Sequence, residues 1–290
     1  KYNYYKKNWK RRRELLLVIF TRLRFKGEFD LPQVYFSYLG SRHKVPTNIP
    51  INSELLRLIG YYIAEGSMDG KNYRISFSFA SKEKEYIEDT CKIVQKLFHF
   101  KPSVSNRRNV TYIDICDKIV YLLFDKILKL PKGAKKKRVP SLVFNIKHEL
   151  QREFIKSLVA GYGTFGQRLD YITSGRNLAS DLLYLFLQNE VIGGLSSTRR
   201  KTMLPSGKSM FAERFNVYVS AWSELSSLDV YPFKKRLRHK SSHRVCMIPT
   251  SCIKEILKML CRKSSNGSLV RFGKRTSKML FEKWLASNEI

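Results

Sequence analysis

The chain has 290 residues with 43% hydrophobic content, which is enough to bury the core of one large domain or two small ones. Its 55 Lys and Arg against 24 Asp and Glu give a formal net charge of +31, which indicates a polyanionic partner rather than a merely solvated surface. No apolar run reaches the roughly 18 residues that a bilayer span needs, and no signal-peptide segment is evident, so the sequence argues against a membrane protein.

Residues 1–49 form a basic N-terminal extension. Its first 13 residues combine Lys and Arg with Tyr4, Tyr5 and Trp9. Basic groups neutralise phosphates and aromatic rings stack on bases, so this segment is interpreted either as a nucleic-acid-binding arm or as a frayed tail.

A motif helix opens the first of two similar segments, residues 50–130. Asn52 or Ser53 can cap this helix, and apolar residues recur at helical spacing up to residues 58–66, which read LIGYYIAEG. An apolar helix that ends in a small residue, an acid and glycine can pack closely against a second helix. It then places a carboxylate, that of Glu65, at its end.

An alternating run follows the motif helix and predicts a half-exposed strand. We expect four of its residues to face the core: Tyr73, Ile75, Phe77 and Phe79. The opposite face presents short and basic groups suited to phosphates or base edges: Arg74, Ser76 and Ser78.

The rest of this segment predicts a helix over 81–98, strands over 102–105 and 109–116, and a helix over 117–129. The turn over 106–109 carries Arg107 and Arg108, which are candidates for contact with nucleic acid. The predicted order is therefore helix, strand pair, helix, strand pair, helix.

A basic linker, residues 131–146, joins the two segments. Its Pro and Gly residues stop the preceding helix, and four cations follow in a row: Lys135, Lys136, Lys137 and Arg138. The run is either a phosphate clamp or a solvated tether, and its place between two segments along one ligand favours the clamp.

The second segment, residues 147–222, repeats the order of the first. Its predicted elements are a helix over 147–161, a strand over 170–173, a helix over 177–191 and strands over 196–203 and 210–220. Candidate nucleic-acid contacts lie on the first of the last two strands: Arg199, Arg200 and Lys201. On the second, we expect three residues to face inward: Phe215, Val217 and Val219. A basic C-terminal extension, residues 223–290, follows.

The motif occurs twice, but its second copy differs at one decisive position. Residues 155–163 read IKSLVAGYG, and the interval from Glu65 to Tyr162 is 97 residues. A carboxylate ends the first helix, whereas a phenol ends the second. Because a phenol has an ordinary pKa of about 10, it is a poor metal anchor near neutral pH.

The paired motifs, their spacing and the repeated order resemble the LAGLIDADG homing endonucleases, particularly the single-chain type of archaeal introns and inteins. The resemblance covers about residues 50–222 and includes Val139-Pro140 and Thr173-Ser174. It implies an α+β fold of two pseudo-symmetric αββαββα repeats that pair through their motif helices. Their sheets form a saddle over the major groove, and the basic extensions lie outside it.

The resemblance also implies roles for individual residues. In active relatives the last acid of each motif binds a divalent metal, usually Mg²⁺, which would clamp the reacting oxygens of a phosphodiester. That role maps onto Glu65, and Tyr162 takes the second, degenerate position. Lys82 fits the basic residue that polarises phosphate or water, Arg176 is its candidate counterpart, and Asp170 is a candidate substitute acid.

Two functions remain open at this point. The first is an impaired DNA endonuclease that uses Mg²⁺ if active, with double-strand cleavage lost or reduced to nicking. The second is a non-catalytic RNA-binding descendant, such as a splicing maturase or a component of a ribosome or other ribonucleoprotein. In both, we expect a monomer with internal pseudo-two-fold symmetry.

The five cysteines form no CxxC pair and the five histidines show no zinc spacing. We therefore expect reduced thiols in an intracellular protein, and the sequence leaves open whether the compartment is the cytoplasm or an organelle.

Overall fold

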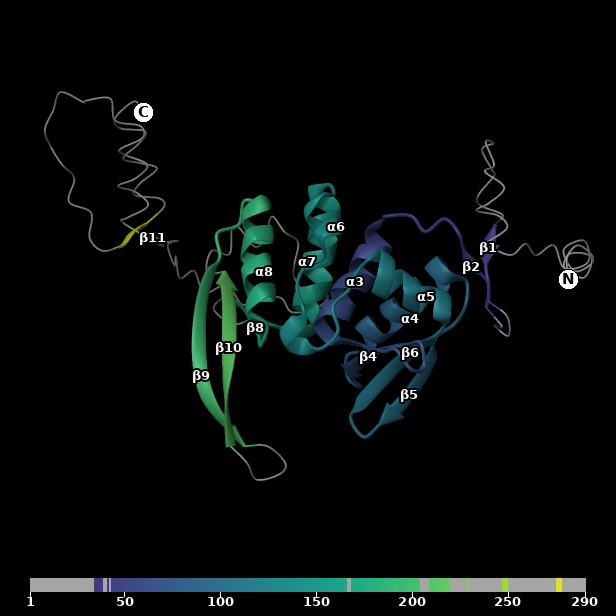
Figure 1. The fold of residues 1–290 in the computed structure, drawn as a ribbon. Helices are drawn as coiled ribbons and strands as arrows, with labels where there is room; N and C mark the ends of the chain where they lie inside the picture. The colour runs from purple at the N-terminus through teal and green to yellow at the C-terminus, as the bar shows by residue number, and fades with distance from the viewer. Residues whose placement is uncertain are drawn as a thin grey trace, which may run out of the picture.

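The computed structural model describes residues 34–38, 41, 43–165, 168–203, 209–219, 228, 247–249 and 275–277. Two helices, α3 (Ser53–Glu65) and α7 (His148–Tyr162), lie side by side at the centre. One four-stranded antiparallel sheet lies on the α3 side and a second on the α7 side. This arrangement confirms the α+β class and the two repeats (Figure 1).

Helix α3 begins and ends where the sequence predicts. The side chain of Asn52 accepts a hydrogen bond from the Leu55 amide at 3.0 Å, which satisfies one of the free amides of the first turn. The chain leaves the helix at Gly66, where a Cβ would lie 2.5 Å from the Tyr62 carbonyl oxygen. Only glycine therefore fits where the helix turns directly into a strand.

The first sheet has the strand order β3-β4-β6-β5. Its elements are β3 (Gly66–Asp69), β4 (Arg74–Ala80), α4 (Lys84–Phe98), β5 (Ser103–Arg107) and β6 (Val110–Cys116). On β4, the expected core residues Ile75, Phe77 and Phe79 are buried.

The inward placement of Tyr73 was wrong. Tyr73 precedes β4 in the turn from β3, has a φ of 47° and is 37% exposed. The strand alternation therefore begins one residue later, because the turn needs a left-handed backbone at this position.

The last helix of the first repeat is shorter than the predicted span over 117–129. Asp117 caps α5 (Lys118–Leu122) through the amides of Ile119 and Val120, and a π-helical turn (Leu123–Ile127) continues it. A left-handed Lys129, with a φ of 51°, then ends the segment. The linker contains a short 3-10 turn (Ala134–Lys136) and α6 (Ser141–Phe144).

The second repeat follows the same order, and its sheet has the strand order β7-β8-β10-β9. Its further elements are β7 (Gly163–Phe165), β8 (Leu169–Thr173), α8 (Arg176–Gln188), β9 (Gly194–Met203) and β10 (Ser209–Val219). Phe215, Val217 and Val219 are buried on β10, as predicted. A closing helix for this repeat lies outside the described residues.

The two repeats meet where α3 packs on α7. Gly60 lies so close to α7 that a Cβ would be 2.7 Å from the Phe154 carbonyl oxygen. Near the other end, a Cβ at Gly161 would be 2.6 Å from the Cβ of Ala64. Small residues at both points allow the two backbones to approach and bring the C-terminal ends of the helices together.

Of the two extensions, the structure describes only small parts. These include the paired strands β1 (Tyr35–Phe36) and β2 (Val45–Pro46), and the paired strands β11 (Met247–Pro249) and β12 (Arg275–Ser277). The predicted arm with Tyr4, Tyr5 and Trp9 and most of the basic C-terminal region lie outside the described residues. None of the helices in the described part could span a bilayer.

Candidate acid site and nucleic-acid interface

The C-terminal ends of α3 and α7 bring Glu65 against the second motif. A Cβ at Gly161 would lie 3.4 Å from the Cγ of Glu65 and 3.8 Å from its Oε1. Tyr162, the last residue of α7, follows this glycine directly, although its side chain lies outside the described part. The one carboxylate therefore lies at the junction of the two motif helices.

The surroundings of Glu65 disfavour its ionised form. Burial raises the pKa of this carboxyl to about 7, while the charge of Lys137 lowers it and that of Glu83 raises it. A carboxyl with a pKa near neutral pH exchanges protons readily, which is common at functional sites.

Lys137 reaches this site from the linker and is a neighbour that the sequence analysis did not identify. Its side chain is buried, and its Nζ donates a hydrogen bond to the Ala64 carbonyl at 3.0 Å. Burial lowers its pKa to about 8, and the nearby Glu65 charge opposes that shift. Its ammonium is thus committed to the end of α3, and no local sequence pattern separates it from the exposed lysines before it.

Lys82 lies between β4 and α4 and is exposed. The next residue, Glu83, is partly buried, and its carboxylate accepts a hydrogen bond from the Ala80 amide at 2.8 Å. Arg176, the proposed counterpart of Lys82, is exposed at the first position of α8. The structure therefore adds Glu83 to the acid site as a second carboxylate from the same repeat.

The described residues do not fit a metal site held by protein ligands alone. Among them, no three His, Cys, Asp or Glu side chains converge, and the site already contains the cationic Lys137 beside Glu65. Magnesium usually keeps several waters and takes one or two carboxylates together with substrate phosphates. Any Mg²⁺ at Glu65 would thus depend on oxygens from a bound nucleic acid.

Asp170, the candidate substitute acid, is already engaged on β8. Its Oδ1 accepts hydrogen bonds from Arg168 Nε at 2.9 Å and from Asn216 Nδ2 at 2.7 Å. A carboxylate neutralised by an adjacent guanidinium is a weak substitute for a free metal ligand.

The outer face of β4 carries the three predicted contact residues. Arg74 is exposed and lies 3.8 Å from Asp69, whereas Ser76 donates a hydrogen bond to Asp114 on the adjacent strand. Ser78 is partly buried. The face is polar, as expected, but acidic partners balance part of its charge.

The hairpin turns present further cations. Arg107 is exposed, with its guanidinium 5.8 Å from the centre of the Tyr112 ring, and Arg108 occupies the turn with a φ of 54°. On β9, the guanidinium of Arg199 lies 4.9 Å from the centre of the Phe211 ring. The backbones of Arg200 and Lys201 continue this strand, while their side chains are not among those described.

The linker cations divide into two pairs. Lys135 and Lys136 are exposed, whereas Lys137 is buried. Arg138 directs its Nε and Nη2 at the Asp181 carboxylate, at 3.2 and 3.3 Å. Within this run, two side chains therefore bind the protein itself and two remain available to phosphates.

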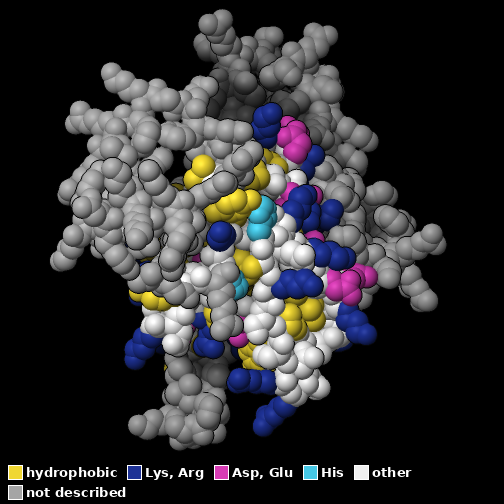
Figure 2. All heavy atoms as spheres, turned by 90° about the vertical axis from the view of Figure 1, so that its right-hand side faces the viewer, with side chains coloured by type: hydrophobic (Ala, Val, Ile, Leu, Met, Phe, Trp, Pro, Cys, Tyr) yellow, Lys and Arg dark blue, Asp and Glu magenta, His cyan; other side chains and the backbone are white. Residues whose placement is uncertain are grey.

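Lys and Arg side chains are distributed over the face next to β1, α4 and α5, with fewer Asp and Glu among them (Figure 2). This distribution fits the overall excess of positive charge, +31 for the whole chain. A broad positive surface attracts polyanions at long range.

Comparison with known families identifies the first repeat. Residues 52–129 match the family model described as a LAGLIDADG-like domain. The recognition of this family in the sequence is confirmed there: the chain contains a LAGLIDADG-like domain.

Curated relatives match about half of the chain. The DNA polymerase II large subunit of Thermococcus kodakarensis is 33% identical over 164 residues, 55% of this chain and 9% of that protein. The uncharacterized protein MJ1054 of Methanocaldococcus jannaschii is 31% identical over 170 residues, 54% of this chain and 18% of that protein. The transcription initiation factor IIB of the same organism is 28% identical over 144 residues, 50% of this chain and 19% of that protein. The chain thus spans less than a fifth of each of these relatives.

Two solved structures were also compared. I-DmoI in complex with DNA and Mn has a TM-score of 0.45 and 14% identity, covering 64% of this chain and 99% of that one. The N-terminal LAGLIDADG domain of DUF199/WhiA has a TM-score of 0.41 and 14% identity, covering 66% and 90%.

Proposed function

We propose that this chain is a nucleic-acid-binding protein of the LAGLIDADG homing endonuclease type that binds duplex DNA. In this proposal its double-strand cleavage is lost or reduced to nicking. One observation carries the proposal: the two motif helices meet end to end, but a carboxylate, Glu65, ends only the first. Cleavage of two strands needs an acid for each scissile phosphate, and Tyr162 supplies none in the second half.

The relatives support a portable module. Segments similar to this chain occur within proteins described as a DNA polymerase II large subunit, a transcription initiation factor IIB and the ATP-dependent DNA helicase Hel308. A segment shared by proteins with such different names does not carry their separate activities. We therefore infer an intron- or intein-associated origin, with DNA as the partner and an intracellular location.

Several parts have assigned roles in this proposal. The faces with Arg74, Arg107 and Arg199 contact the nucleic acid, together with the exposed linker lysines. Lys82 and Glu65 form the remaining acid site, with Mg²⁺ required if nicking occurs and no cofactor otherwise. The protein acts as a monomer with internal pseudo-two-fold symmetry.

A supercoiled plasmid that carries the target sequence separates the possible outcomes. We expect intact or nicked circles in the presence of Mg²⁺, and Glu65→Gln should abolish nicking. Glu88→Gln is the matched control, because Glu88 is exposed on α4 and pairs with Lys92. Linear product from the native chain would contradict the loss of the second acid site.

Structured RNA is the second candidate partner, because the net charge of +31 and the basic extensions suit any polyanion. Affinities for duplex DNA and folded RNA at matched salt distinguish the two. A clear preference for folded RNA would replace the DNA proposal with an RNA-binding descendant, such as a maturase or ribonucleoprotein component.

A further inference from the structure

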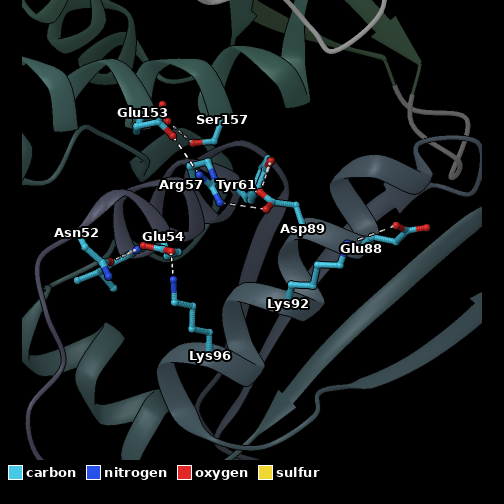
Figure 3. A network of polar contacts seen from close by, with 11 residues as sticks. Asn52, Glu54, Arg57, Tyr61, Glu88, Asp89, Lys92, Lys96, Glu153 and Ser157 are labelled. Atoms are coloured by element: carbon cyan, nitrogen blue, oxygen red, sulfur yellow. Dashed lines mark hydrogen bonds and ion pairs between the residues drawn. The ribbon is translucent and has the colours of Figure 1, made fainter.

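A buried polar network lies at the interface between the repeats, away from the acid site (Figure 3). Arg57 of α3 donates a hydrogen bond from Nη1 to Glu153 of α7 at 3.1 Å. Its Nε and Nη2 donate to the two oxygens of Asp89 on α4, each at 3.1 Å. Tyr61 donates to Asp89 at 3.0 Å, which completes the network.

The 97-residue offset between the motifs shows that this network has no symmetric copy. Arg57 corresponds to Phe154 in α7, and Glu153 corresponds to Leu56 in α3. The pseudo-symmetric counterpart of the pair Arg57 and Glu153 is therefore Leu56 with Phe154, and both of these side chains are fully buried. One side of the axis pairs charge with charge, and the other pairs apolar with apolar.

Pairing of two identical helices would mix these types. In a pair of α3 helices, each Arg57 would face a Leu56, and in a pair of α7 helices each Glu153 would face a Phe154. Each such contact leaves an interface charge without its partner on the opposing helix, which is costly.

Steric fit adds a second barrier, which acts on α7. A Cβ at Gly60 would lie 2.0 Å from Ser157 Oγ and 2.7 Å from the Phe154 carbonyl oxygen. Ser157 occupies the equivalent position in α7 and has a Cβ. Two α7 helices could not approach as closely as α3 and α7 do.

We propose that the α3–α7 interface accepts only a first repeat with a second repeat and rejects a second copy of either. The consequence rests on the proposed function: two first repeats would bring together two Glu65 carboxylates, whereas the selective interface keeps one acid in each protein. Selectivity here comes from unfavourable alternatives as much as from the native contacts.

The experiment starts from the folded full-length chain. A protease recognition sequence is inserted between Gly133 and Ala134, which are exposed, and a Cβ at Gly133 would meet no atom within 4 Å. After cleavage, the two pieces are unfolded, refolded together and weighed by native mass spectrometry. We expect the 1:1 pair to exceed pairs of the first piece at least about tenfold, which corresponds to roughly 1.4 kcal/mol.

Arg57→Met should raise the fraction of first-piece pairs several-fold, because methionine opposite Leu56 leaves no unpartnered charge. Lys92→Met is the matched control, since Lys92 is an exposed α4 lysine, and it should leave the ratio unchanged. Abundant first-piece pairs from the native sequence, or no increase with Arg57→Met, would overturn the proposal. The readout is mass, so cleavage activity does not enter it.

A double-mutant cycle in the uncut chain keeps the proposal testable if the pieces do not refold. Arg57→Met, Glu153→Gln and their combination are compared by urea unfolding. Coupling between the two positions of at least about threefold in the folding equilibrium is expected for a contacting ion pair. Additive effects would show that Arg57 does not recognise α7 through Glu153.

Discussion

Replacing Gly60 with alanine tests the close approach of the two motif helices. The added methyl group would lie 2.0 Å from Ser157 Oγ, 2.7 Å from the Phe154 carbonyl oxygen and 3.1 Å from the Leu158 amide nitrogen. The hydroxyl can rotate away, but the two backbone atoms cannot move without shifting α7. Gly60→Ala therefore forces the repeats apart along their shared core.

The expected loss follows from two opposing effects. Overpacking of a close-packed interface typically costs about 1–3 kcal/mol, and the backbone contacts here place Gly60→Ala at or above the top of that range. Alanine in place of glycine inside a helix returns about 1 kcal/mol. The net destabilisation is about 2 kcal/mol, which lowers the melting temperature by roughly 4–8 °C in a domain of this size.

Thermal and urea unfolding followed by circular dichroism measure this loss. Ser157→Ala in the same background removes only the hydroxyl contact, so it should restore less than half of the stability. A Gly60→Ala protein as stable as the native one would refute the close approach. Full rescue by Ser157→Ala would place the obstruction at the hydroxyl rather than at the backbone of α7.

Three further predictions concern the acid site and the linker. Burial raises the pKa of Glu65 from 4.5 to about 7, so the folded state binds more protons between these values and stability should fall as pH rises through that window. Glu65→Gln should flatten this part of the urea-unfolding pH profile, and an unchanged slope would contradict the burial of the carboxyl. The pKa of Lys137 is lowered from 10.5 to about 8, so stability should rise between pH 8 and 10.5, and Lys137→Met should remove that rise, with Lys136→Met as an exposed control. Exchange of both Lys135 and Lys136 for glutamine should reduce the slope of log affinity against log salt by about 2, whereas a slope that stays the same would remove the linker from the nucleic-acid contact.

The asymmetry of the acid site and that of the helix interface point in the same direction. Position 162 lacks a carboxylate, and positions 57 and 153 carry opposite charges where their counterparts are apolar. Each feature makes the two repeats chemically distinct although their folds are alike. A duplicated fold thus supports two halves with different tasks.

The sequence by itself determined the architecture of this protein. Helical periodicity with the Asn52 cap predicted α3, alternation predicted the buried residues of β4 and β10, and the repeated motif predicted the paired repeats. These patterns are local, so neighbouring residues along the chain are sufficient to specify them. Tyr73 was placed wrongly for a local reason as well, since strand alternation does not reveal where a turn ends.

Only the tertiary structure decided which charged groups meet. Lys137 is chemically indistinguishable from Lys136 in the sequence, yet one is buried beside Glu65 and the other is exposed. Arg57 and Glu153 lie 96 residues apart and belong to different repeats, and their contact depends on how α3 crosses α7. Burial and ion pairing arise from the packing of distant elements, so a local sequence pattern contains no record of them.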